Sequence, residues 1–166
     1  VQEGAQQARL LSRGLNPIKV SDQGLQTALR ELAANMHKLS DVPCLFQSEG
    51  DIPPQDAETT LHLYRIAQEA VNNALKHAKA EHIWIRLAYK APSIVLTVED
   101  DGQGLPASLE NREGIGRRVM QHRAHLIGAT FKLEAAPSGG TRALCLLPLN
   151  ENKTPASVAA LKDTTP

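Results

Sequence analysis

The segment QEAVNNALKHA, residues 68–78, carries the side chains of this chain that are best suited to chemistry. Glu69, Asn73 and His77 are spaced four residues apart, so on an α-helix they would form one polar stripe. At about 100° per residue, this stripe drifts toward the apolar arc of the same helix. An amide at the edge of a buried face costs about 1–3 kcal/mol when it has no partner. Asn73 is therefore expected to bind either neighbouring backbone or a ligand.

A second candidate is VEDDGQGLP, residues 98–106, in which an apolar strand ends in two acids and two glycines. A carboxylate at a strand end can accept a hydrogen bond from an exocyclic amine, which would select adenine over guanine. Gly102 and Gly104 would let the backbone approach a flat ring. An ordinary turn after a strand is the simpler alternative. A dinucleotide-binding fingerprint is excluded, because Pro106 interrupts the required helix and no acid follows about 20 residues on.

Two further glycine motifs follow. GIGRRVM, residues 114–120, opens a helix whose first N–H groups suit a phosphate, although a flexible N-cap would explain the same glycines. It is not a Walker loop, because no Gly-Lys-Ser/Thr follows. SGGTR, residues 138–142, lies between two strands and is also typical of a glycine hairpin. His122 and His125 are three apart on a predicted helix, but no nearby acid or cysteine completes a metal site.

Hydrophobic periodicity predicts the elements that position these motifs. Helices are expected at 22–38, 55–78 and 115–127, and strands at 44–47, 82–90, 93–100, 130–135 and 142–147. This order favours an α/β (α+β) two-layer sandwich, with a mixed, mostly antiparallel sheet of about five strands and three helices on one face. Residues 1–14 are expected to end an upstream helix, 15–149 to form one domain, and 150–166 to be a disordered tail.

Composition narrows the class of protein further. A length of 166 residues suits one domain, and a net charge of zero with 3% aromatic residues argues against direct nucleic-acid binding. Cys44 and Cys145 lie in apolar runs, so buried reduced thiols and a cytoplasmic location are expected. No apolar run approaches the roughly 20 residues that span a bilayer, so no membrane contact is expected of this piece. Val1 in place of Met suggests a fragment or a processed chain, and the motifs that follow favour the expectation of a fragment.

Together, in this order and at these spacings, the four motifs resemble the ATP-binding domain of sensor histidine kinases. The superfamily also includes gyrase, mismatch-repair and heat-shock ATPases, and the resemblance implies its Bergerat ATP-binding fold. QEAVNNALKHA is similar to the N box of that family, and VEDDGQG, GIGRRVMQHRA and SGGT resemble its three glycine boxes. The form E-A-x-x-N-A-x-x-H-A and the upstream RLLSRGLNPIKVSDQGLQTALREL resemble the nitrate-sensor (NarL-partner) subfamily. The resemblance covers roughly residues 8–148.

The resemblance implies a phosphate end of the pocket whose polar side chains all lie on one helix: Glu69, Asn73, Lys76 and His77. Asn73 would coordinate Mg²⁺ bound to the triphosphate, and Glu69 would hold a metal-bound water or act as base. Gly114 and Gly116 would end a mobile lid over the phosphates. The residues themselves agree with this reading, because Mg²⁺ prefers few protein ligands together with phosphate oxygens. Positioning and charge neutralisation would then be the main catalytic work.

The resemblance also implies a base end of the pocket. Asp100 would accept a hydrogen bond from the adenine amine, and Gly102 and Gly104 would shape the pocket around the ring. Thr141 would close the base side. Asp101 departs from the family pattern, which often has Asn there. A second carboxylate adds negative charge near the base, so the assignment of Asp100 can slip by one position.

The implied activity is transfer of the ATP γ-phosphate to a histidine. No histidine precedes His37, and neither His37 nor His62 has an acidic follower, so the acceptor is expected on a dimerisation domain absent from this chain. The expected partners are that domain, within a full-length homodimer, and a response regulator with a DNA-binding output domain. The alternatives are a serine kinase of the anti-sigma-factor type, which shares the fold, and an ATP-sensing module without transfer.

Overall fold

A computed structural model describes residues 24–104 and 114–149. The upstream helix expected at 1–14 and the tail expected at 150–166 fall outside the described residues, as does the segment 105–113. In chain order the elements are α3 (Leu25–Leu39), β1 (Cys44–Glu49), α4 (Ala57–Asn73), the π-helical turn η1 (Ala74–Ala78), β2 (Ile83–Lys90), β3 (Ser93–Asp100), α5 (Ile115–Leu126), β4 (Thr130–Ala135) and β5 (Thr141–Pro148).

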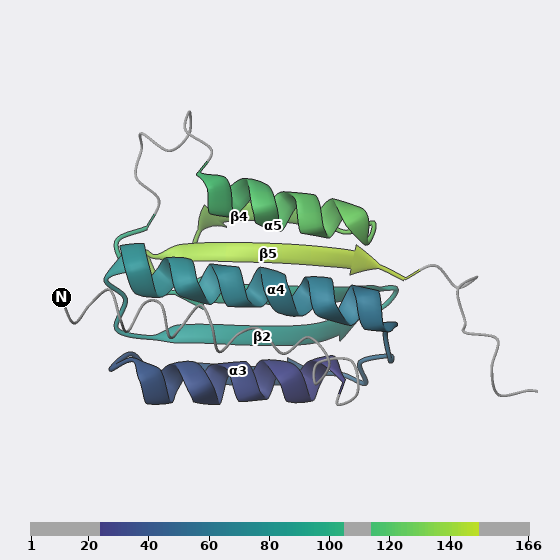
Figure 1. The fold of residues 1–166 in the computed structure, drawn as a ribbon, viewed down its shortest axis with the longest axis horizontal. Coiled ribbons are helices and arrows are strands. Elements are labelled where there is room, and N and C mark those ends of the chain that lie inside the picture. The colour runs from purple at the N-terminus through teal and green to yellow at the C-terminus, as the bar shows by residue number, and fades with distance from the viewer. Residues whose placement is uncertain (1–23, 105–113, 150–166) are drawn as a thin grey trace, which may run out of the picture.

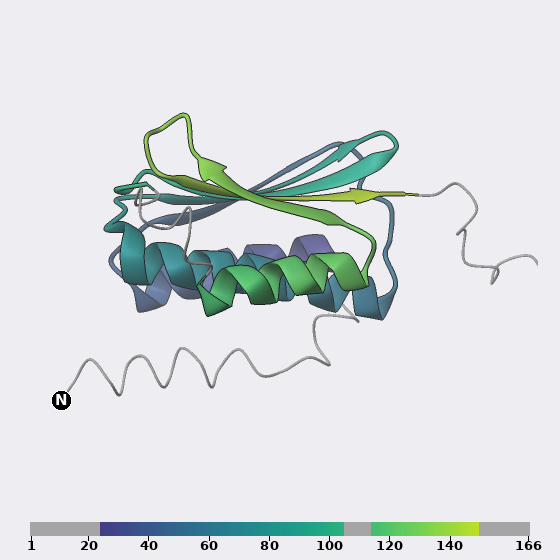
Figure 2. The same cartoon turned by 90° about the horizontal axis from the view of Figure 1, so that it is seen from above.

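The five strands form one mixed sheet in the order β1-β2-β3-β5-β4. Only the β1–β2 pair is parallel, and the other three pairs are antiparallel. Helices α3, α4 and α5 all lie on one face of this sheet, with α4 between the other two (Figures 1 and 2). The predicted two-layer fold with a mostly antiparallel sheet is therefore confirmed.

The hydrophobic core lies between the two layers. Along β2 and β3 every second residue is buried, as expected for strands with one covered face: Ile83, Ile85, Leu87, Ile94, Leu96 and Val98. Asp100 continues the inward alternation of β3, so its side chain emerges on the helix-covered side at the end of the strand. Glu99 takes the opposite face.

The long predicted helix over 55–78 is divided in the structure. Asp56 caps the start of α4, because its Oδ1 accepts a hydrogen bond of 2.7 Å from the N–H of Thr59. The α-helix ends at Asn73, and the next five residues form the π turn η1. A π turn has i→i+5 hydrogen bonds and is uncommon. Lys79 then leaves the helix in a left-handed conformation, with a φ of 50°.

No helix within 24–104 or 114–149 has both the length and the apolar character needed to cross a membrane.

Candidate functional site

Glu69 and Asn73, on the last turns of α4, lie against the start of α5. Both are half-buried. A Cβ added to Gly116 would lie 2.5 Å from Oε1 of Glu69 and 3.2 Å from Nδ2 of Asn73. The second glycine box therefore packs on the polar side chains of the N box, and a side chain at position 116 would displace them. The structure thus brings Glu69, Asn73 and Gly116 together.

Lys76 and His77 differ from the expectation of a single helical stripe. Both are exposed and lie in η1 rather than in a continuing α-helix. Because a π turn holds more residues than an α turn, the spacing of four no longer places His77 directly above Asn73. The stripe of Glu69, Asn73 and His77 is therefore interrupted after Asn73. Among the described residues, neither Lys76 nor His77 has a hydrogen bond or ion pair to the other candidates.

Asp100 is buried at the end of β3, beside the β4–β5 hairpin. Its Oδ1 accepts hydrogen bonds from the N–H of Gly102 at 2.9 Å and of Thr141 at 3.2 Å. A Cβ on Gly140 would collide with the backbone carbonyl of Asp100 and lie 2.5 Å from Oδ1. The first and third glycine boxes thus meet at this carboxylate, where the structure brings Asp100, Gly102 and Thr141 together.

Burial raises the pKa of Asp100 above its ordinary value, because desolvation disfavours the charged form. The two N–H groups on Oδ1 work in the opposite direction, and the neighbouring carboxylates of Asp101 and Glu99 add to the increase. A carboxylate that is partly desolvated in this way is a stronger hydrogen-bond acceptor toward a ligand than one in water.

Asp101 serves a different purpose from its neighbour. Its Oδ1 accepts hydrogen bonds of 2.8 Å from the N–H groups of both Glu81 and His82, and its Oδ2 lies 2.9 Å from Nδ1 of His82. Burial alone would raise the pKa of Asp101, but these bonds outweigh it and lower the pKa overall. The side chain therefore fixes the start of β2.

Three predicted glycines differ in how tightly they are packed. A Cβ on Gly102 would collide with the backbone of Ala78, whose carbonyl also accepts a 2.8 Å hydrogen bond from Gln103 N–H. Gly104 has a φ of +75°, and its Cβ would lie 2.9 Å from the carbonyl oxygen of Gly139. Gly114 faces open space at the N-terminus of α5. Gly102 and Gly104 therefore join separate motifs by close backbone contact, whereas Gly114 makes no such contact.

Sequence reasoning passed over two residues at this end of the sheet. Gly140, inside the SGGTR motif, is the glycine that contacts Asp100, and Ser138 donates to both Glu99 and the backbone of Asp100. The motif itself was a signal for both, because a short Ser-Gly-Gly turn permits close backbone approach.

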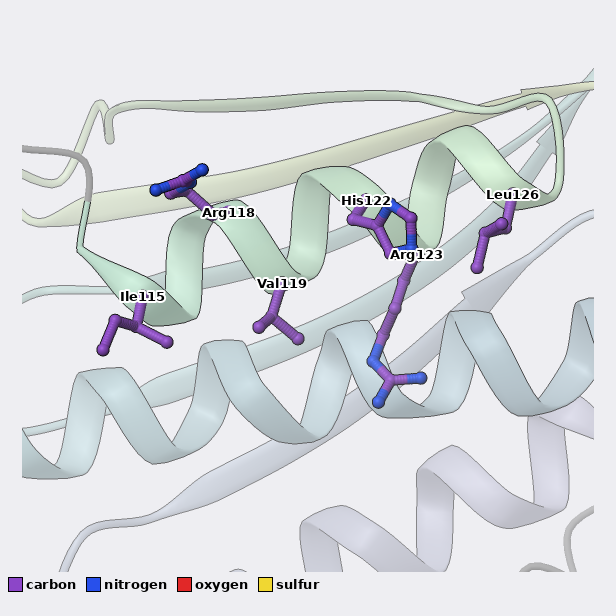
Figure 3. A pocket seen from close by; sticks show the side chains of 6 residues that line it. All are labelled: Ile115, Arg118, Val119, His122, Arg123 and Leu126. Atoms are coloured by element: carbon purple, nitrogen blue, oxygen red, sulfur yellow. The ribbon is translucent and has the colours of Figure 1, made fainter.

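A shallow hollow along α5 is separate from these residues. Its lining side chains all come from this one helix: Ile115, Arg118, Val119, His122, Arg123 and Leu126. In Figure 3 the side chains of Ile115, Val119 and Leu126 point the same way from the helix, and Ile115 is 84% exposed. None of the predicted pocket residues lines this hollow.

Glu69 and Asn73 together offer a carboxylate and an amide oxygen, which are hard ligands of the kind Mg²⁺ prefers. Across the two described ranges, no group of three or more His, Cys, Asp or Glu side chains could enclose a metal ion. The donor set therefore fits a metal that completes its coordination with phosphate oxygens and water, and does not fit a structural metal cage.

Comparison with known proteins places the chain in a family of ATPases. The family model described as "Histidine kinase-, DNA gyrase B-, and HSP90-like ATPase" matches residues 58–151. The chain is 30% identical over 156 residues to the sensor protein VraS of Staphylococcus saprophyticus, covering 94% of this chain and 44% of that protein. VraS of Staphylococcus aureus is 29% identical over 151 residues, with 91% and 43% covered. The chain thus spans less than half the length of these curated relatives.

Two solved structures share the fold. The histidine kinase domain of the blue-light activated kinase from Erythrobacter litoralis EL346 matches with a TM-score of 0.70 and 21% identity, over 88% of this chain and 82% of that one. The ATP-binding domain of PrrB from Mycobacterium tuberculosis matches with a TM-score of 0.56 and 21% identity, over 75% and 93%. The family match covers more than half of the chain, and it includes the N box and all three glycine boxes. The chain belongs to the histidine kinase-, DNA gyrase B- and HSP90-like ATPase family.

Proposed function

We propose that this chain is the catalytic, ATP- and Mg²⁺-binding domain of a two-component sensor histidine kinase. One observation supports this most: motifs that are far apart in sequence meet in space. Gly116 packs on Glu69 and Asn73, and Gly140 packs on Asp100. These contacts, with that of Gly102 on Ala78, support a site at one end of the two-layer fold where a single nucleotide would contact all four motifs.

At the base end, Asp100 is the residue that would recognise adenine. Its Oδ1 already accepts from two backbone N–H groups, so Oδ2 is the atom proposed to accept from the exocyclic amine. Guanine presents a carbonyl oxygen at that position, which a carboxylate would repel. Gly102, Gly104 and Thr141 would line the ring.

At the phosphate end, Asn73 would supply an amide oxygen to Mg²⁺ and Glu69 would hold a metal-bound water or accept a proton. Bound Mg²⁺ would neutralise charge on the phosphates. The N-terminus of α5, with Gly114 and Gly116, would offer backbone N–H groups to the same phosphates. The exposed Lys76 and His77 would approach from η1 once a triphosphate is present.

Phosphotransfer requires an acceptor, and we place it outside these 166 residues. The proposed acceptor is a histidine on the dimerisation domain of a longer, homodimeric sensor, with a response regulator as the subsequent partner. The proposed location of this domain is the cytoplasm, and the assignment to the nitrate-sensor-type subfamily stays a prediction. The work of Asn73, Glu69 and Asp100 would be to position the γ-phosphate for attack, because phosphoryl transfer depends chiefly on positioning and charge stabilisation.

The test is equilibrium binding of ATP with and without Mg²⁺ to the wild type and to Asn73→Ala. We expect Mg²⁺ to increase the affinity of the wild type for ATP and to have little effect on the variant. Asn72→Ala, on the same turn of α4, is the matched control and should keep the metal dependence. If Asn73→Ala retains the full effect of Mg²⁺, the proposed metal role is wrong.

A second measurement addresses the transfer step. This chain alone, incubated with radiolabelled ATP, is expected to acquire no stable, acid-labile phosphate. Efficient self-labelling would contradict the proposal that the acceptor lies elsewhere, and acid-stable transfer to serine would favour a serine kinase of the anti-sigma-factor type.

A further inference from the structure

We infer that Ser138 is a positioning residue of the base pocket, holding the turn at residues 138–141 against the end of β3. The inference rests on the proposed function, since it concerns the pocket around Asp100. Ser138 would support the pocket from the sheet face that the helices do not cover. The inference predicts that this side chain, which does not itself line the pocket, affects the affinity for the base.

The hydroxyl of Ser138 lies between two acceptors at the end of β3. Its Oγ is 3.3 Å from Oε1 of Glu99 and 3.2 Å from the backbone carbonyl oxygen of Asp100. One hydroxyl proton serves both acceptors, so the serine is held at the point where the strand ends. Because Ser138 is itself exposed and in a turn, it contributes little to the hydrophobic core.

Glu99 gives this contact a fixed anchor. Its side chain is only 8% exposed, and its Oε2 lies 3.1 Å from both Nε and Nη2 of Arg142 and 3.3 Å from Nη1 of Arg86. Arg142 also reaches Glu134 on β4 at 3.6 Å. Arg142 is directly opposite Glu99 and Glu134 in the sheet register, so the network joins β2, β3, β5 and β4. A carboxylate held by two guanidinium groups is a well-placed acceptor for Ser138.

The turn that Ser138 begins is the one that touches Asp100 on the pocket side. Gly140 packs on the carbonyl and Oδ1 of Asp100, and Thr141 N–H donates to that Oδ1. The carbonyl of Gly139 meets the first glycine box at Gly104. A shift of the turn would therefore change both the hydrogen bonding of Asp100 and the space beside it.

The experiment compares Ser138→Ala, which removes the hydroxyl, with Ser138→Thr, which keeps it. Ser48→Ala, at an exposed position on the edge strand β1, is the control. Affinities for Mg·ATP and for AMP are measured by displacement of a fluorescent ATP analogue, and urea unfolding midpoints are recorded for each variant. AMP is included because it carries the base without the β- and γ-phosphates.

We expect Ser138→Ala to weaken ATP binding by about fivefold, the size of one hydrogen bond, and to weaken AMP binding by a similar factor. Ser138→Thr, which keeps the hydroxyl, should bind both nucleotides as well as the wild type does. The urea unfolding midpoints of both variants should stay close to that of the wild type. Wild-type affinity in Ser138→Ala, or equal losses in the Ala and Thr variants, would overturn the positioning role. A loss for ATP without one for AMP would also overturn it. The wild-type titration separately tests the proposed function, which is wrong if the wild type binds neither nucleotide.

Discussion

Substituting Gly102 with Ala is predicted to loosen the contact that joins the first glycine box to the N box. A Cβ at this position would lie 2.7 Å from both the carbonyl carbon and the Cβ of Ala78, and closer still to the carbonyl oxygen. Ordinary contact begins near 3.4 Å, and the atoms in the way belong mostly to backbone, which cannot rotate aside. The loop or η1 must therefore move.

The size of the effect can be worked from these contacts. Overpacking a tight site costs about 1–3 kcal/mol. The displacement would also break the hydrogen bond from Gln103 N–H to the carbonyl of Ala78, at about 1 kcal/mol. The free energy of unfolding should fall by about 2–4 kcal/mol, which for a domain of this size lowers Tm by roughly 5–15 °C.

Gly114→Ala is the matched control, because its Cβ would face open space and its φ of −59° suits alanine. Thermal unfolding followed by circular dichroism and ATP binding would be measured on both variants. We expect Gly102→Ala to lose stability and affinity, and Gly114→Ala to keep the wild-type Tm. An unchanged Tm in Gly102→Ala, or equal losses in both variants, would refute the reasoning from backbone contact.

Three further predictions concern other parts of the structure. Asp56→Ala should lower unfolding stability by about 1 kcal/mol at neutral pH. The hydrogen bond from the N–H of Thr59 lowers the pKa of Asp56 in the folded protein. The stability that this carboxylate contributes is therefore present above its ordinary pKa of 3.8 and is lost as the pH falls through the lower folded pKa. Urea titrations at several pH values would measure this loss. Burial raises the pKa of the thiols of Cys44 to about 11 and of Cys145 to about 12, so iodoacetamide should label them slowly until urea is added. Asp101→Asn should lose its ion pair with His82 yet bind ATP nearly as well as the wild type in the same displacement assay. A large loss of ATP affinity would indicate that Asp101, and not Asp100, contacts the base.

Most of the sheet could be predicted from sequence because alternation is strong where one face is covered. The predicted strands at 93–100 and 130–135 match β3 and β4 in the structure. β1 continues two residues past the predicted end, through Ser48 and Glu49. Its last three residues are exposed and polar on an edge strand, so they lack the alternation of apolar and polar residues that predicts a strand.

The helix carrying the N box shows what local pattern could not provide. Its existence and its apolar face were predicted, but the change to a π turn after Asn73 depends on backbone hydrogen bonding that residue types do not report. Nor could sequence alone reveal that Gly102 meets Ala78 or that Ser138 meets Glu99, because those partners are 24 and 39 residues apart. The sequence proposes Asp100 for the base contact, and the hydrogen bonds that Asp101 accepts from Glu81 and His82 support that proposal over the neighbouring carboxylate.

The central claim is that this fold binds ATP with its base at Asp100. The most direct measurement is calorimetric titration of the wild type and Asp100→Asn with Mg·ATP and Mg·GTP. We expect the wild type to bind Mg·ATP in preference to Mg·GTP by on the order of tenfold or more, because the buried carboxylate would be left unpaired by guanine. Asp100→Asn should lose most of that preference. Equal affinity of the wild type for the two nucleotides, or an unchanged preference in Asp100→Asn, would contradict the account.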